Sequence, residues 1–262
     1  MGTNEADVNT VQRVFNQYNV CVVVPTYNNE GTIQDVLNRM LAYTDRIIVI
    51  DDGSTDSTSR LLAPYHRRIV AINRHVRNRG KGKALCTAFG IARAAHYRYL
   101  LTIDADGQHY PEDLPRFADA LEQHPDAVII GSRNLQQPNM PGKSSFANRF
   151  SNFWFHLQTG QRLPDTQTGY RLYPLQHFPE KLLFPARYEA ELLLLVQAAW
   201  RGVKLLPIYI RVYYPPREER VSHFRPVADF ARISLLNTFL CIGAVCYGFP
   251  LQLIRFFKNR PA

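Results

Sequence analysis

The stretch Arg98-Tyr-Leu-Leu-Thr-Ile-Asp-Ala-Asp-Gly-Gln-His109 joins a short apolar run to a cluster of polar side chains. The run is typical of a buried strand. Asp104 and Asp106 follow it one residue apart, so on an extended chain both carboxylates point to the same side. With Gln108 they form a set of oxygen ligands that favours Mg²⁺ or Mn²⁺. The same residues are also typical of an Asp-Gly turn whose carboxylates accept backbone N–H groups.

Outward from this stretch, apolar runs alternate with amphipathic segments through the first half of the chain. The apolar runs predict strands, and apolar residues three and four positions apart predict helices. The predicted strands are residues 20–25, 46–50, 68–72, 98–103 and 127–130, with helices between them. This alternation predicts an α/β fold with a mostly parallel sheet covered by helices on both faces.

Polar clusters follow these strands at their carboxyl ends, where open parallel sheets bind ligands. Asp51-Asp-Gly-Ser54 offers acceptors for a nucleotide base or ribose, or a turn that leads into a helix. Asn78-Arg-Gly-Lys-Gly-Lys83 brings backbone amides and two Lys to the start of a helix, which suits a diphosphate. A tight turn explains this loop equally well. Glu189 and Glu191 open an apolar helix, where the helix dipole favours carboxylates.

The charge of the chain favours anionic partners. Its 262 residues include 31 Lys and Arg against 22 Asp and Glu, a net charge of +9. Such an excess suits nucleic acid, a diphosphate substrate or an anionic membrane surface. Nucleic-acid bases stack on aromatic side chains, and only Tyr213, Tyr214 and Phe224 lie among the basic residues. We therefore expect no nucleic-acid partner. The four Cys form no paired motif, which predicts a reducing compartment.

The C-terminal segment is apolar and carries no charge from residue 233 to 254. Its length approaches that of a membrane span, whereas Asn237, Gln252 and Pro250 argue against one. Basic residues flank it at Arg211, Arg217, Arg220, Arg225, Arg232, Lys258 and Arg260. We expect a helix that lies in the plane of an anionic membrane, with a span or a core helix as alternatives. The predicted divisions are a polar extension (1–18), an α/β domain (19–225) and a membrane-associating segment (226–262).

Six motifs in this order resemble those of the family 2 glycosyltransferases of the GT-A fold, and especially the dolichyl- and polyprenyl-phosphate sugar transferases. They are Pro25-Thr-Tyr-Asn-Asn-Glu30, Asp51-Asp-Gly-Ser-Thr-Asp56, Asn78-Arg-Gly-Lys-Gly82, Asp104-Ala-Asp-Gly-Gln-His109, Gly131-Ser-Arg133, and Asp165 through Arg171. The resemblance covers roughly residues 20–226. Asn29 stands where the family commonly has an acid, and Glu30 follows it.

The resemblance implies a set of site residues. It places four residues around the nucleotide: Pro25, Tyr27, Glu30 and Asp52. It places Asp104 at the ribose and diphosphate and gives Mg²⁺ or Mn²⁺ to Asp106 and Gln108. Lys81, in the basic loop that suits a diphosphate, is a further candidate for donor binding. Arg133 and Arg171 are expected to meet phosphates of the donor or acceptor.

The resemblance also implies an activity: inverting, metal-dependent transfer of a sugar from a UDP- or GDP-sugar to a lipid-linked acceptor. The expected acceptor is a polyprenyl phosphate at the cytoplasmic face of the membrane. A phosphate oxygen is already an anion, whereas a hydroxyl acceptor needs a base, for which Glu191 is the candidate. The non-enzymatic alternative is a membrane scaffold that binds a nucleotide sugar without catalysis.

Overall fold

Seven strands form one mixed sheet in the order β3-β2-β1-β4-β6-β5-β7. The computed structural model describes residues 4–133, 142–179, 189–214 and 226–258. The strands are β1 (Val20–Thr26), β2 (Ile47–Asp51), β3 (Ala71–Arg74), β4 (Tyr99–Thr102), β5 (Val128–Arg133), β6 (Arg171–Pro174) and β7 (Leu205–Ile210). Only β6 among them runs antiparallel to its neighbours, β4 and β5. The expectation of a mostly parallel α/β sheet is therefore confirmed.

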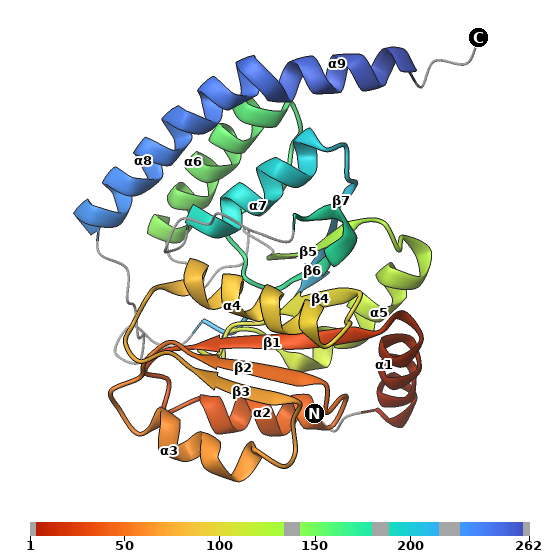
Figure 1. The fold of residues 1–262 in the computed structure, drawn as a ribbon, viewed down its shortest axis with the longest axis vertical. Helices are drawn as coiled ribbons and strands as arrows, with labels where there is room; N and C mark the ends of the chain where they lie inside the picture. Colours follow the sequence, from red (N-terminus) through yellow and green to blue (C-terminus); the bar gives the residue numbers. More distant parts are fainter. Residues whose placement is uncertain (1–3, 134–141, 180–188, 215–225, 259–262) are drawn as a thin grey trace.

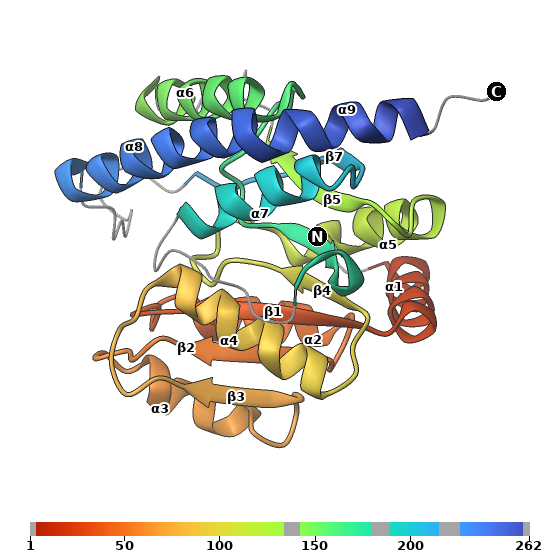
Figure 2. The ribbon, with the colours of Figure 1, turned by 45° about the horizontal axis from the view of Figure 1, so that its top comes forward.

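Helices cover both faces of the sheet, as Figure 1 shows. They are α1 (Glu5–Tyr18), α2 (Ile33–Leu41), α3 (Thr58–Leu62), α4 (Lys81–Ala94), α5 (Leu114–Gln123), α6 (Gly142–Thr159) and α7 (Glu189–Trp200). One apolar core joins the sheet to α1, α2 and α5. A second core joins its other face to α4 and α7, and α6 packs outside α7 (Figure 2). Short 3₁₀ turns occur at Ala63–Tyr65, Pro111–Asp113 and Leu175–His177.

Helix α1 belongs to the domain rather than to a separate extension. Its side chains Val11, Val14 and Phe15 are buried in the core that also contains α5. Val8 and Tyr18 also pack against this core, and most of the remaining positions are polar, which gives the segment its hydrophilic composition. The domain boundary expected at residue 19 therefore leaves out a helix that helps to close one end of the core.

The C-terminal segment is helical from Pro226 to Lys258. It consists of α8 (Pro226–Gly243), a π-helical turn (Ala244–Gly248) and α9 (Phe249–Lys258). The part between Arg232 and Arg255 is long and apolar enough, by length and composition, to cross a membrane. The preceding basic residues Arg217, Arg220 and Arg225 lie outside the described residues, as does Arg260.

Polar contacts fix one side of this segment to the domain. The Gln158 side chain donates from Nε2 to Asn237 Oδ1 at 2.9 Å, and Arg255 Nη1 donates to the Trp200 carbonyl at 3.0 Å. A Cβ at Gly248 would lie 2.4 Å from Trp200 Nε1, so the helix backbone approaches the indole very closely. The segment is therefore an outer layer of the folded domain, beside α6 and α7 (Figures 1 and 2).

Candidate active site

The carboxyl ends of β1, β2 and β4 meet at one edge of the sheet, away from α1 in Figure 1. Antiparallel β6 begins at the same edge, because Thr102 of β4 pairs with Arg171. The polar motifs expected at strand ends therefore lie along a single edge. Pro25 and Tyr27 are half-buried at the end of β1.

Lys81 joins two of the expected carboxylates. Its Nζ lies 2.6 Å from Asp104 Oδ1 and 3.1 Å from Glu191 Oε1, which brings the start of α4, the end of β4 and the start of α7 together. Burial acts to lower the pKa of Lys81, but the two carboxylates outweigh it and raise that pKa above its ordinary value. Burial acts to raise the pKa of Asp104, whereas the Lys81 ammonium and then His109 hold it below its usual range. The cluster is thus a charged, partly dehydrated triad.

Asp106 lies beside this triad with its charge poorly compensated. Its Oδ1 accepts a hydrogen bond from the Gln108 backbone N–H at 3.0 Å. Burial and then the Asp104 carboxylate raise the pKa of Asp106, because both penalise a second negative charge there. A bound cation would remove that penalty.

The residues fit a hard divalent cation. The Asp106 carboxylate and the Gln108 side-chain amide are oxygen ligands of the type that such an ion takes, and positive charge there would relieve the repulsion that raises the pKa of Asp106. His109 Nδ1 is buried without a hydrogen-bond partner in the described chain and lies 3.9 Å from Asp104 Oδ2. Within the described ranges, no three His, Cys, Asp or Glu side chains form a metal-binding group, so such a site depends on the amide or on the substrate.

Asp52 is buried at the end of β2 and faces the loop before α4. Its carboxylate accepts hydrogen bonds from the Gly80 N–H at 2.7 Å and the Arg79 N–H at 3.0 Å. Glu30 is exposed and faces a different turn, where its Oε2 accepts from the Ser57 N–H at 2.8 Å. The two acids expected around the nucleotide therefore have separate surroundings, and Asp52 bonds to the two residues that directly precede Lys81.

The two expected phosphate-binding arginines also differ. Arg133 donates from Nε and Nη2 to both Asp165 oxygens, at 2.6 and 2.9 Å. Arg171 is completely buried, and its guanidinium donates to the carbonyls of Glu191 at 2.7 Å and Thr166 at 2.8 Å. Arg171 therefore lies beneath the surface of this edge, where it bonds to backbone carbonyls, and its contact with a phosphate stays a prediction.

Sequence reasoning missed two residues at this edge. A Cβ at Gly169 would lie 2.3 Å from Asp104 Oδ2, so this glycine allows the backbone to touch the carboxylate. His75 is buried after β3 and contacts Asp52. The position of His75, just beyond a predicted strand and four residues before the Arg79-Gly80 pair, was the available signal.

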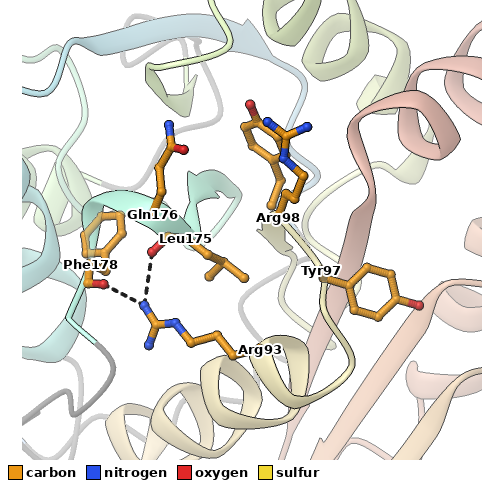
Figure 3. A pocket seen from close by; sticks show the side chains of 7 residues that line it. Arg93, Tyr97, Arg98, Leu175, Gln176 and Phe178 are labelled. Atoms are coloured by element: carbon orange, nitrogen blue, oxygen red, sulfur yellow. Dashed lines mark hydrogen bonds between the residues drawn. The ribbon is translucent and has the colours of Figure 1, made fainter.

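A hollow of about 430 Å³ lies at the opposite edge of the sheet, before β4 and after β6. Figure 3 shows that Arg93 is directed at backbone carbonyls there, and it donates to Leu175 O at 3.1 Å and Phe178 O at 2.7 Å. The Arg93 guanidinium is thus hydrogen-bonded within the protein, and the Asp104 and Glu191 carboxylates lie at the other end of the strands. We therefore place the reaction at the carboxyl edge.

Known proteins are similar to this chain in sequence and in fold. Residues 21–176 match the family described as "Glycosyl transferase family 2". An uncharacterized protein of Methanocaldococcus jannaschii is 32% identical over 207 residues, which are 76% of this chain and 84% of that protein. The UDP-N-acetylglucosamine–dolichyl-phosphate N-acetylglucosaminyltransferase of Methanococcus voltae is 28% identical over 174 residues, 59% of this chain and 68% of that one.

A solved structure has a similar fold. Glucosyl-3-phosphoglycerate synthase from Mycobacterium tuberculosis, in complex with Mn²⁺, uridine diphosphate and phosphoglyceric acid, superposes with a TM-score of 0.64 at 17% identity. The match covers 93% of this chain and 83% of that one. The family match covers more than half of the chain. This chain therefore belongs to glycosyl transferase family 2 and is a glycosyltransferase of the GT-A fold.

Proposed function

We propose that this glycosyltransferase transfers a sugar from a nucleoside-diphosphate donor to a polyprenyl phosphate, with inversion at the anomeric carbon. One observation carries the proposal: the Lys81 ammonium lies between Asp104 and Glu191 at the carboxyl edge, next to the under-compensated Asp106. The leaving group of such a reaction is a diphosphate, and a preorganised cation beside it stabilises the charge that develops as the bond breaks.

The donor fits the loop between β3 and α4. Gly80, with φ of +91°, turns the chain so that the first amides of α4 and the Lys81 side chain lie at the same end of the helix. A helix N-terminus with a lysine suits a diphosphate. Asp52 lies at the same loop and suits the N–H groups of a base. The M. voltae relative is named for a UDP-sugar donor, and the superposed structure is a complex with uridine diphosphate, which supports a UDP-sugar ahead of a GDP-sugar.

Asp106 and Gln108 are the residues that would hold Mg²⁺ or Mn²⁺. A divalent ion bound there supplies positive charge beside the departing diphosphate. The chain itself contributes Lys81, whose ammonium donates to diphosphate oxygens, and Asp104, which orients that ammonium at 2.6 Å. The Gly169 backbone lies against the Asp104 carboxyl group, where a Cβ would lie 2.3 Å from Oδ2.

The acceptor reacts on the face of the sugar opposite the leaving diphosphate, which gives inversion. A lipid phosphate brings an anionic oxygen, so no side chain has to remove a proton. In that case Glu191 serves to balance Lys81 and to hold it in place. The M. voltae relative is named for transfer to dolichyl phosphate, which supports an acceptor of this class.

A hydroxyl acceptor is the second candidate, and the position of Glu191 favours it. This carboxylate is nearly buried and lies in the same cluster as Asp104, where a general base would be needed. Its ion pair with Lys81 opposes that role, because the ammonium already occupies one carboxylate oxygen at 3.1 Å.

We further propose that the protein acts at the cytoplasmic face of a membrane, bound through α8 and α9. Large apolar side chains face outward along this segment: Leu235, Phe239, Ile242, Val245, Leu253, Ile254 and Phe257. Phe153 and Leu157 of α6 are exposed beside them. We call this set the apolar outer face. The opposite side of the segment is bound to the domain, so a position in the membrane plane suits it better than a span.

Thermal unfolding in the presence of UDP, GDP and their sugars tests the donor, each with Mg²⁺, Mn²⁺ or no metal. We expect one nucleotide to raise the melting temperature, and only with metal, because ligands that bind the folded state stabilise it. Asp106→Ala should abolish the shift, whereas Asp119→Ala, on the exposed side of α5, should retain it. An equal shift in Asp106→Ala and wild type would contradict the metal assignment, and no shift with any nucleotide would contradict the donor.

Transfer assays with Glu191→Gln distinguish the acceptors. We expect the variant to lose transfer to a hydroxyl acceptor by about 100-fold or more and to retain much of its transfer to a polyprenyl phosphate. Radiolabelled sugar in the lipid phase measures both reactions. Equal loss with both acceptors would show that Glu191 does not act as a base for one of them alone.

A further inference from the structure

His75 lies between the expected base-binding acid and the helix that carries Lys81. It follows β3, and its backbone N–H continues the sheet ladder by donating to Asp51 O at 2.8 Å. The residue is 7% exposed. Its Nδ1 lies 2.6 Å from Asp52 Oδ1, and its Nε2 lies 2.9 Å from Thr87 Oγ1 on α4.

The direction of the hydrogen bond to Asp52 follows from its other partners. Both carboxylate oxygens already accept from backbone N–H groups, those of Arg79 and Gly80, so the carboxylate acts as an acceptor. Nδ1 of His75 is therefore the donor. With these three donors, a carboxylate that offers about four lone-pair sites has room for one more N–H.

The surrounding backbone leaves this arrangement little freedom. Gly53, beside Asp52, has φ of +75°, and a Cβ there would lie 2.5 Å from the carbonyl carbon of Arg77. The turn after β2 is thus packed directly on the loop before α4. His75 is the side chain that joins the two at the Asp52 carboxylate, because it reaches both Asp52 and Thr87.

We propose that His75 is a positioning residue for the donor. Its Nδ1–H holds the Asp52 carboxylate in the plane in which one free lone pair faces the nucleotide base, and it keeps the Arg79-Gly80 loop, and hence Lys81, in register with that acid. The proposal rests on the nucleoside-diphosphate donor proposed above. Loss of the Nδ1 contact should weaken donor binding. Binding of the acceptor should change little, because the proposal gives Asp52 no contact with it.

Two amide variants separate the two ring nitrogens. Asn places an N–H near the position of Nδ1, so His75→Asn keeps the contact with Asp52 and loses the one with Thr87. Gln reaches further, to the position of Nε2, so His75→Gln keeps Thr87 and loses Asp52. His75→Leu loses both. His66, which is exposed, provides the control His66→Gln.

Calorimetric titration with UDP and with GDP, each in Mn²⁺, measures donor affinity, and steady-state kinetics give KM for donor and acceptor. We expect His75→Gln and His75→Leu to weaken nucleotide binding by about tenfold or more, as loss of a hydrogen bond to a charged group does. His75→Asn should stay within about threefold of wild type on the same grounds. The donor KM should rise in step, with the acceptor KM unchanged.

Melting temperatures of all variants distinguish positioning from a merely structural role. If His75→Asn and His75→Gln lower the melting temperature by the same amount and bind the nucleotide with the same affinity as each other, His75 does not position Asp52. If His75→Gln binds the nucleotide as wild type and His75→Asn does not, the Thr87 contact matters and the proposal is overturned. If wild type binds neither nucleotide, the donor proposal fails first, and this inference fails with it.

Discussion

Gly169 and Asp104 are in direct contact, although 65 residues separate them in the chain. The contact makes Gly169 a residue that sets the position of a carboxylate. Any side chain at position 169 would meet the Asp104 carboxyl group before it met solvent. Because the Asp104 carboxylate orients the Lys81 ammonium, a side chain at position 169 that displaced Asp104 would also displace Lys81.

We therefore predict that Gly169→Ala lowers sugar transfer by about 100-fold or more, since misplacing a reacting group by about 1 Å has that effect. Initial rates with saturating donor and acceptor measure it. Gly90→Ala is the matched control, because a Cβ there meets nothing within 4 Å and Ala stabilises a helix interior. Full activity in Gly169→Ala would show that the Asp104 position does not matter for the reaction.

Asp106 carries a stability cost that is tied to pH. Its folded pKa is raised by burial and by Asp104, so the folded protein loses stability as pH rises through that pKa. The loss is fully present above the raised pKa and is absent below the ordinary pKa of an aspartate. We predict that Asp106→Asn raises the melting temperature of the metal-free protein by a few degrees at neutral pH and leaves it unchanged in acid.

The same variant should bind Mn²⁺ at least about tenfold more weakly. Asp104→Asn is the contrasting control, because it removes the partner of the Lys81 ammonium and should lower the melting temperature at neutral pH. Calorimetric melting from pH 3 to 8 measures both variants. Destabilisation by Asp106→Asn at neutral pH would contradict the repulsion between the two carboxylates.

At the scale of elements, Asp165 ties three segments together. Its fully buried carboxylate accepts from Arg133 at the end of β5, from Asn148 of α6 at 3.1 Å and from the Gln167 N–H at 3.0 Å. Burial acts to raise the pKa of Asp165, but Arg133 holds it below its usual range. The ion pair therefore anchors α6 and the loop before β6 to the edge of the sheet.

We predict that Asp165→Ala lowers the free energy of unfolding by about 3 kcal/mol, because it leaves the largely buried Arg133 cation without its carboxylate. Adding Arg133→Met should recover part of this loss, since the unpaired charge is then gone. Glu122→Ala breaks an exposed pair with Arg13 and should change stability little. Urea unfolding measures all four proteins. An equal effect of the buried and exposed pairs would refute the anchoring role of Asp165.

The sequence predicted elements whose signal is local. Strands β1, β2 and β4 are continuous apolar runs, and their polar ends identified the carboxyl edge. Helix α1 was missed because only a narrow stripe, including Val11 and Phe15, faces the core. The contact of Lys81 with Glu191 joins residues 110 positions apart, and no spacing rule predicts it. Arg171 at the start of a strand has the same local pattern whether it meets a phosphate or, as here, backbone carbonyls.

On the scale of the whole molecule, the charged edge and the apolar outer face lie on different sides of the fold. The carboxylates lie at strand ends, whereas α6, α8 and α9 form an outer layer beyond α7 (Figure 2). The exposed large apolar residues of α8 recur at positions 235, 239 and 242, which is the spacing of one helix face. A membrane bound there would leave the catalytic edge open to a soluble nucleotide donor.

We predict that Phe239→Glu combined with Ile242→Glu weakens binding to vesicles of anionic lipid by about 100-fold or more, because each side chain would otherwise bury its apolar surface. Nucleotide binding should not change, since neither residue approaches the carboxyl edge. Gln12→Glu with Gln17→Glu on the exposed side of α1 adds the same charge and should leave vesicle binding nearly unchanged. Flotation with liposomes measures the effect.

A protease-cleavable tag after Ala262 then distinguishes a span from an in-plane helix. If the helix between Arg232 and Arg255 crossed the bilayer, the tag and the catalytic domain would lie on opposite sides of a sealed vesicle. The contacts of Asn237 with Gln158 and of Arg255 with Trp200 oppose this, because a span would have to break them and bury the freed polar groups in lipid. We therefore expect protease to reach the tag from the side that carries the domain. Protection of the tag would show that α8 and α9 leave the domain and cross the membrane.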